Sequence, residues 1–231
     1  MNITIEPGAS ALLDALHRAG FAAYAVGGCV RDSLLGLAPH DWDLCTAARP
    51  GQVMELFGED RCIPTGLQHG TVTVKRDGRL YEITTFRTEG SYSDGRHPDS
   101  VAFVPDVRED LARRDFTINA MMRDVLTGEV IDHWGGQADL QARIIRCVNE
   151  KTFPEDALRV FRAAQFAARL NAQIEERTLA LCREINVEAI SPERIFEEMK
   201  KALFGFSSGM PARAPWCRMK RETSCSILYF L

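Results

Sequence analysis

The stretch VGGCVRDSLLGLAPHDWDL, residues 26–44, decides the fold, because it joins two strand-like runs through a short helical segment and carries polar motifs at both junctions. The apolar run 21–26 predicts a strand, and a tight Gly-Gly turn at 27–28 follows it. Residues 30–35 have a helical pattern that ends at a glycine, and 40–45 predicts a second strand. Short strands that alternate with helices predict an α/β domain.

The second strand carries two carboxylates, Asp41 and Asp43, on either side of Trp42. Side chains two residues apart on a strand share a face, which places these carboxylates about 6.6 Å apart along it. Both can then reach one pair of divalent ions about 3.5–4 Å apart, as in metal-assisted nucleotidyl transfer. Trp42 and Leu44 are expected to point into the core. A solvated turn is the alternative, because D-x-D on its own is common.

The Gly27-Gly28 turn lies where a helix begins, and backbone N–H groups together with the helix dipole favour a phosphate there. Arg31 adds a guanidinium beside that position, with a salt bridge to Asp32 as the alternative interpretation. A phosphate site and a two-carboxylate metal site so close in sequence indicate a nucleoside triphosphate bound as its Mg²⁺ complex.

A β-hairpin is predicted from two strand-like runs, 71–75 and 80–86, that flank Asp-Gly at 77–78. The neighbours of Glu82 on the second strand are apolar and core-facing, so Glu82 falls on the opposite face. It is a candidate third acid near the metal ions. A surface glutamate with no such role is the alternative.

The segment 113–119, RRDFTIN, combines adjacent arginines with a capping residue. Asp115 is expected to be the N-cap of a helix that continues through Met122. Arg113 and Arg114 then precede the cap, where they can hold phosphate or ribose oxygens. A solvated basic turn is the alternative.

The helix expected over 155–170 carries a polar stripe of Asp156, Arg159 and Arg162 on an otherwise apolar segment. A surface ion pair is one interpretation. The other is a protein substitute for a template base, because a fixed carboxylate acceptor beside a guanidinium donor matches the pairing edges of cytosine and adenine. Uracil and guanine present donors and acceptors in the reverse order, and a wrong base leaves buried groups unpaired.

Composition is that of a soluble globular protein: 231 residues, 45% hydrophobic, 26% charged and a net charge of −4. We expect no membrane span and no secretory signal. The seven cysteines form no C-x-x-C pair, so we interpret them as reduced thiols of a cytoplasmic protein.

Three regions are predicted along the chain. Residues 1–136 are expected to form a catalytic head, with a mobile loop at 88–98. The helical pattern over about 137–204 predicts an all-helical neck, taken as 137–205, that contains the base-recognition stripe. Residues 206–231 have neither helical nor strand periodicity, and we expect an anomalous, disordered tail. An out-of-frame end and a divergent tail are both open interpretations of that segment.

Five stretches together resemble the successive motifs of bacterial class II CCA-adding tRNA nucleotidyltransferases and the related poly(A) polymerases. The resemblance covers residues 22–204 and implies a polymerase-β-like head, a mixed sheet with flanking helices, followed by a helical neck. Some relatives carry an arginine where this chain has Gln165, and nothing after Gly205 resembles the family's body and tail domains. The stretches are VGGCVRDSLLGLAPHDWDL (26–44), TTFRTEGSYSDGRHPDSV (84–101), RRDFTINAM (113–121), EDALRVFRAAQFAARL (155–170) and SPERIFEEMKKAL (191–203).

The resemblance also implies roles for individual residues. Asp41 and Asp43 would bind Mg²⁺, and the 88–98 loop would help to switch from adding C to adding A. The expected nucleotide-binding residues are Gly27, Gly28 and Arg31 at the triphosphate, Arg114 and Asp115 at ribose or phosphate, and Asp156 and Arg159 at the base with Arg162 close by.

The implied activity is template-independent addition of C, C and A to the 3′ end of tRNA from CTP and ATP. It would proceed by two-metal nucleotidyl transfer with release of pyrophosphate. The alternatives are a poly(A) polymerase, an enzyme that adds only CC or only A, and a truncated nucleotide- or RNA-binding module with little activity. Oligomeric state is not predicted.

Overall fold

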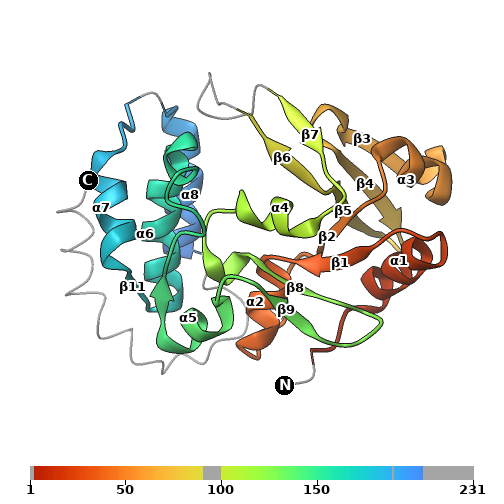
Figure 1. Cartoon of the computed structure of the whole chain (residues 1–231), viewed down its shortest axis with the longest axis horizontal. Coiled ribbons are helices and arrows are strands. Elements are labelled where there is room, and N and C mark those ends of the chain that lie inside the picture. The colour runs from red at the N-terminus through yellow and green to blue at the C-terminus, as the bar shows by residue number, and fades with distance from the viewer. Residues whose placement is uncertain (1–2, 91–99, 189, 205–231) are drawn as a thin grey trace.

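The computed structural model describes residues 3–90, 100–188 and 190–204. A sheet with flanking helices forms one side of the molecule, and α6, α7 and α8 form the other, with α4 between them (Figure 1). Most of the loop predicted at 88–98, and the tail predicted at 206–231, lie outside the described residues.

The central sheet has seven strands in the order β3-β4-β5-β2-β1-β8-β9. Among the strands that the structure describes, β2 and β5 pair in parallel and the other neighbours in this sheet pair antiparallel. The predicted mixed sheet is therefore confirmed. The strands are β1 (Ala23–Val26), β2 (Asp43–Thr46), β3 (Cys62–Gly66), β4 (Thr71–Arg76), β5 (Arg79–Thr85), β8 (Met121–Arg123) and β9 (Val130–Asp132).

Helices flank this sheet and form the second part of the molecule. The first helix buries Leu12, Leu13 and Leu16 against the core, as its sequence period predicts. Across the described residues, no helix combines the length and the apolar character that a membrane crossing needs. The helices are α1 (Pro7–Arg18), α2 (Gly28–Leu34), α3 (Pro50–Phe57), α4 (Val107–Ala112), α5 (Gly136–Ala142), α6 (Leu158–Leu170), α7 (Glu176–Glu184) and α8 (Pro192–Phe204), with 3₁₀ turns η1 (Glu59–Arg61), η2 (Leu67–His69), η3 (Thr117–Asn119) and η4 (Phe153–Glu155).

The predicted hairpin is confirmed as β4 and β5, which pair in register from Thr71 opposite Thr84 to Arg76 opposite Arg79. Its two-residue turn has positive φ angles, 50° at Asp77 and 75° at Gly78. Asp and Gly tolerate that backbone, and the turn's twist matches that of the strands, which is why the dipeptide predicts the hairpin.

The helix predicted from Asp115 through Met122 is wrong. Only the 3₁₀ turn η3 follows the capping residue, and the chain then enters strand β8. In that strand Met122 pairs with both Val26 and Ile131. Pairing on two sides buries the methionines completely, and this tertiary contact outweighs the local helix signal.

The pattern of the segment 137–204 predicts helix throughout, and this prediction is wrong. The segment also contains a short parallel strand pair, β10 (Ile144–Ile145) with β11 (Gln173–Ile174). A second small pair, β6 (Arg87–Glu89) with β7 (Val101–Phe103), extends from the head. The helix expected from residue 155 begins at Leu158, and the preceding turn is η4.

Aromatic packing joins the two parts of the molecule. The ring of Phe116 meets the rings of Phe153 and Phe166 edge-on, with centroids 5.8 Å apart in each case.

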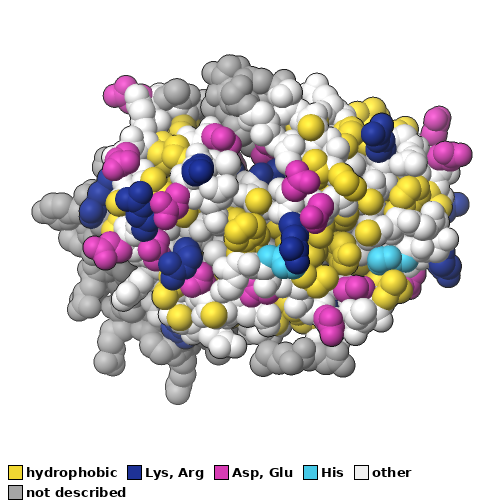
Figure 2. All heavy atoms as spheres, viewed as in Figure 1, with side chains coloured by type: hydrophobic (Ala, Val, Ile, Leu, Met, Phe, Trp, Pro, Cys, Tyr) yellow, Lys and Arg dark blue, Asp and Glu magenta, His cyan; other side chains and the backbone are white. Residues whose placement is uncertain are grey.

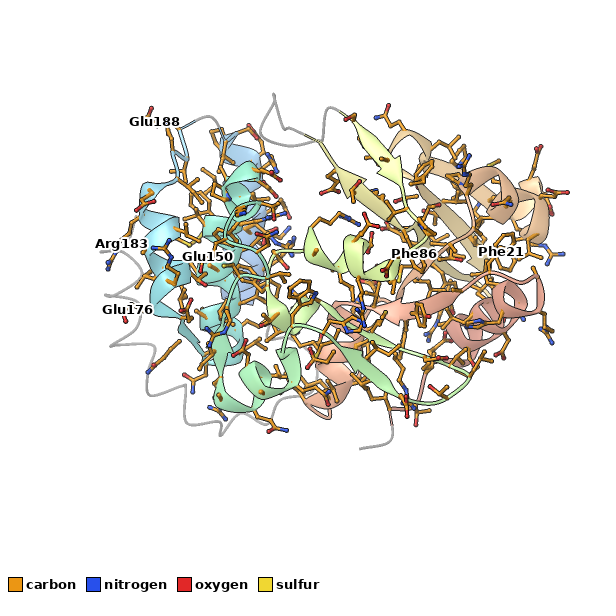
Figure 3. All side chains as sticks on the ribbon, in the orientation of Figure 1. Phe21, Phe86, Glu150, Glu176, Arg183 and Glu188 are labelled. Atoms are coloured by element: carbon orange, nitrogen blue, oxygen red, sulfur yellow. The ribbon has the colours of Figure 1, made fainter. Side chains whose placement is uncertain are left out.

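On the outer side of α7, Glu176 and Arg183 point away from the sheet, whereas Phe86 lies within the head (Figure 3). On the face shown in Figure 2, acidic and basic side chains are interspersed over the helical part.

Candidate active site

An acidic group lies at the start of β2. Asp43 is the first residue of that strand and pairs with Glu82 of β5. Asp41 precedes the strand and is exposed, with its Oδ1 3.0 Å from Nδ1 of His40. Trp42 and Leu44 are buried, which confirms their predicted direction. Asp43 therefore lies on the side of the strand opposite Leu44, on a face where Cys45 is buried farther along.

Negative charge accumulates in this group, as the pKa values show. Burial raises the pKa of Asp43; Arg114 opposes this effect, and Asp41 adds to it. Burial also raises the pKa of Glu82, and both Asp43 and Asp41 raise it further. A divalent cation relieves such repulsion, and carboxylate oxygens are the ligands that Mg²⁺ prefers. The donor set thus fits Mg²⁺, although the described residues contain no ready-made group of three or more metal-ligating side chains.

Arg114 lies between the acidic group and the Gly27 turn. Its Nη2 donates to Oδ2 of Asp110 at 3.3 Å, and its charge reaches Asp43. Gly27 has a φ of 80°, and a Cβ built there would stand 3.3 Å from Nη1 of Arg114. Any side chain at that position is strained and also crowds the guanidinium. A glycine is needed to bring the backbone and the arginine together.

Arg31 is buried beside the same turn. A Cβ built on Gly28 would be 3.5 Å from its Nη2. The salt bridge to Asp32 that the sequence leaves open is present at 2.7 Å. Nη1 also donates to Oδ1 of Asn119 at 2.6 Å, and the guanidinium carbon lies 5.0 Å from the ring centroid of Phe166. The arginine is therefore held rigidly next to the turn.

Asp115 binds Arg162, the last residue of the predicted stripe. Its Oδ2 lies 2.6 Å from Nη2 of Arg162, and its Oδ1 accepts the N–H of Phe116 at 2.7 Å. Burial alone raises the pKa of this carboxyl, but Arg162 and the hydrogen bond from Asn119 outweigh burial and lower it. Asp115 is thus held ionised between the head and α6.

Asp156 and Arg159 do not form the surface ion pair that their spacing allows. Arg159 is 5% exposed, and it donates to the backbone oxygens of Thr152 at 2.8 Å and Arg113 at 2.7 Å. Asp156 precedes α6, accepts the N–H of Leu158, and lies 3.6 Å from Nη2 of Arg194. Burial raises the pKa of Asp156, against the opposing hydrogen bond from Leu158 and the charge of Arg159.

Residues 113–115 connect these groups. The backbone oxygen of Arg113 accepts from Arg159, the charge of Arg114 acts on Asp43, and Asp115 pairs with Arg162. The acidic group, the glycine turn and the start of α6 therefore meet around one short segment, not on opposite sides of the molecule.

Several residues of this arrangement are not predicted from the sequence. Asn119 and Arg194 belong to motifs quoted above, but their partners Arg31 and Asp156 lie in distant elements. Asp110 lies in α4 and pairs with Arg113 and Arg114, which follow it by three and four residues. For Asn119, its position four residues after Asp115 is the local signal, because that spacing matches the contact between the two side chains. The five cysteines of the described residues are free, and four of them are buried.

Known proteins resemble this chain in sequence and fold. The Poly A polymerase head domain family matches residues 23–146. The CCA-adding enzyme of Limosilactobacillus fermentum is 48% identical over 204 residues, 87% of this chain and 50% of its own. The Lactobacillus helveticus CCA-adding enzyme is 50% identical over 198 residues, 84% of this chain and 49% of its own.

Solved structures agree with the sequence comparison. The Bacillus stearothermophilus CCA-adding enzyme in complex with CTP is 41% identical, with a TM-score of 0.76 over 86% of this chain and 49% of its own. A CCA-adding enzyme in complex with ATP is 25% identical, with a TM-score of 0.71 over 96% and 50% of the two chains. The chain spans about half the length of the curated relatives it matches. By its sequence and its mixed-sheet nucleotidyltransferase fold, this chain belongs to the Poly A polymerase head domain family.

Proposed function

We propose that this chain is the nucleotidyltransferase portion of a CCA-adding enzyme, which adds C, C and A to the 3′ end of tRNA from CTP and ATP without a nucleic-acid template. The observation that carries the proposal is the link through residues 113–115, which joins the acidic group at β2 to the polar start of α6. The similar proteins reported above are CCA-adding enzymes, which supports the same activity.

In this proposal, residues 1–136 form the catalytic head and 137–205 the base-recognition neck. Asp41 and Asp43 hold Mg²⁺, and Glu82 is the third acid of the site. When bound, the metal ions lower the pKa of the attacking 3′-hydroxyl and offset charge as pyrophosphate leaves. Glu82 contributes negative charge beside Asp43, which strengthens the site's preference for a dication over a monocation.

The triphosphate is held on the other side of Arg114. The N–H of Gly27 donates to the backbone oxygen of Met121 at 3.0 Å, so Gly27 contributes the shape of the turn. The donors proposed for the triphosphate are the N–H of Gly28 and the guanidinium of Arg31, and the arginines supply the positive charge that phosphates need. Arg31 has five N–H donors in all. Its contacts to Asp32 and Asn119 leave others for a ligand.

Base choice rests on Asp156 and the two arginines that follow it. The Asp156 carboxylate accepts from the exocyclic amino group of cytosine or adenine, and a guanidinium donates to the adjacent ring nitrogen. Arg159 keeps N–H groups beyond the two that bind backbone oxygens. Uracil presents a carbonyl to the carboxylate, and that unpaired contact disfavours it.

The test is incubation of a tRNA that lacks CCA with the protein, Mg²⁺ and all four triphosphates, followed by sequencing of the 3′ ends. CCA ends support the proposal. Runs of A identify a poly(A) polymerase, and CC or a single A identifies a partial activity. The absence of any addition, together with retained CTP binding, identifies a nucleotide-binding module instead.

A further inference from the structure

Asn119 lies between two residues of the proposed nucleotide site. It is 6% exposed. Its Oδ1 accepts from Nη1 of Arg31 at 2.6 Å, and its Nδ2 donates to Oδ1 of Asp115 at 3.1 Å. A guanidinium can only donate and a carboxylate can only accept, so these partners fix the direction of the amide. One side chain thus joins an arginine of the head to the carboxylate that pairs with α6.

Each end of this link is held from elsewhere. Arg31 is bound to Asp32, and its guanidinium carbon lies 5.0 Å from the ring centroid of Phe166. Arg162 is bound to Asp115 and lies 5.5 Å from the same ring centroid. The two guanidinium groups therefore share one aromatic ring and one hydrogen-bonded chain through Asn119.

Asp115 has no acceptor capacity to spare. Its Oδ1 accepts from Phe116 and Asn119, and its Oδ2 accepts from Nε of Arg162 at 2.8 Å and lies 2.6 Å from Nη2. These four contacts fill the roughly four lone-pair sites of a carboxylate. Loss of Asn119 leaves one acceptor of Asp115 and one donor of Arg31 without a partner inside the protein, where unmet groups are costly.

We propose that Asn119 is a positioning residue, which holds the guanidinium groups of Arg31 and Arg162 in a fixed relation for the triphosphate and the base of an incoming nucleotide. The inference rests on the proposed function for the identity of the ligand. The arrangement itself is a property of the free protein and is tested there first.

The first experiment measures rotation of the Arg31 guanidinium about its Nε–Cζ bond through its ¹⁵Nη NMR signals, without nucleotide. Asn119→Ala is expected to speed this rotation at least severalfold. Asn186→Ala is the matched control, because Asn186 is exposed and its Oδ1 accepts the N–H of Glu188, only two residues away. Unchanged Arg31 rotation in Asn119→Ala overturns the inference, whatever the protein's activity.

The second experiment compares the Kd for CTP with that for cytidine, which lacks phosphates. Asn119→Ala is expected to weaken CTP binding about tenfold, as for one charge-assisted hydrogen bond, and cytidine binding less than about threefold. Equal losses for both ligands point to general loosening and contradict the proposal. If Asn119→Ala is unstable, Asn119→Asp keeps the acceptor for Arg31 and loses the donor to Asp115. A wild-type protein that binds no CTP refutes the proposed function, whereas the rotation measurement still decides the role of Asn119.

Discussion

Asp43 and Glu82 stand opposite each other on the parallel strands β2 and β5, so two carboxylates that repel are held side by side by backbone pairing. Without a bound cation, the repulsion between Asp43 and Glu82 is expected to lower the free energy of unfolding. When a cation is bound, the same two negative charges attract the cation. In the function proposed above, this pairing favours a bound cation at the expense of the free protein.

Glu82→Gln is expected to stabilise the metal-free protein by up to about 1 kcal/mol, because like charges directly opposite each other in a sheet are destabilising. Urea unfolding in EDTA measures this change. In excess Mg²⁺ the gain is expected to shrink or reverse. The control is Glu55→Gln on the exposed face of α3. Destabilisation of the metal-free protein by Glu82→Gln contradicts this interpretation.

Asp41→Asn and Asp43→Asn are each expected to lower the rate of nucleotide addition by about 10³-fold or more, since metal-ion charge stabilisation contributes several kcal/mol. The melting temperature is expected to change little for Asp41, which is exposed. Asp60→Asn, an exposed carboxylate elsewhere in the head, serves as the control. Full activity of Asp41→Asn removes the metal assignment.

The preference for CTP over UTP is expected to decrease as pH falls. The decrease is expected at a higher pH than it would be for an aspartate with the usual pKa. Burial raises the pKa of Asp156, so its carboxyl takes up a proton above the usual value of about 3.9. Once protonated, it donates where it must accept. Incorporation ratios measured between pH 8 and pH 5 test this, with Asp156→Asn as the pH-independent reference. A constant ratio in the wild type contradicts the role of Asp156.

Asp110→Ala is expected to destabilise the protein by about 3–5 kcal/mol at pH 7, because it removes the buried carboxylate that pairs with both Arg113 and Arg114. Of these two arginines, only Arg113 keeps a second ion pair among the described residues, with Glu89. Burial alone raises the pKa of Asp110, but Arg113 and Arg114 outweigh it and lower the pKa. The stabilisation is therefore present above the unfolded pKa of about 3.9 and is lost as pH falls through the lower folded value.

Chemical unfolding at pH 7 and at pH 2–3 measures this effect, and the difference between wild type and Asp110→Ala is expected to narrow in acid. Asp106→Ala is the control for the size of the effect, because Asp106 is the exposed N-cap of the same helix. Loss of this cap is expected to lower the free energy of unfolding by about 1 kcal/mol. A difference that does not change with pH rules out the ion pairs as its source.

The sequence is sufficient for features that local chemistry determines. The β4–β5 hairpin is predicted because Asp77 and Gly78 accept the backbone that the turn requires. The direction of Trp42 and Leu44 follows from strand alternation. The helix expected after Asp115 fails because β8 is stabilised by strands on both sides, which no local pattern reveals.

The candidate site divides in the same way. The polar motifs are visible in the sequence, but the contact of Arg159 with the backbone of Arg113 depends on how α6 packs on the head. Arg194 reaches Asp156 from α8, and Asn119 reaches Arg31 across 88 residues. Such partners follow from tertiary packing and cannot be assigned from spacing.

The parallel pairing of β2 with β5 also shapes how the chain reaches its native state. A hairpin needs only a short turn, whereas parallel neighbours need a long crossover, which here runs through α3, β3 and β4. Contacts between segments so far apart close late, after local ones have formed. We therefore expect Asp43 and Glu82 to meet late in folding, so that their repulsion hastens unfolding and leaves the rate of folding almost unchanged.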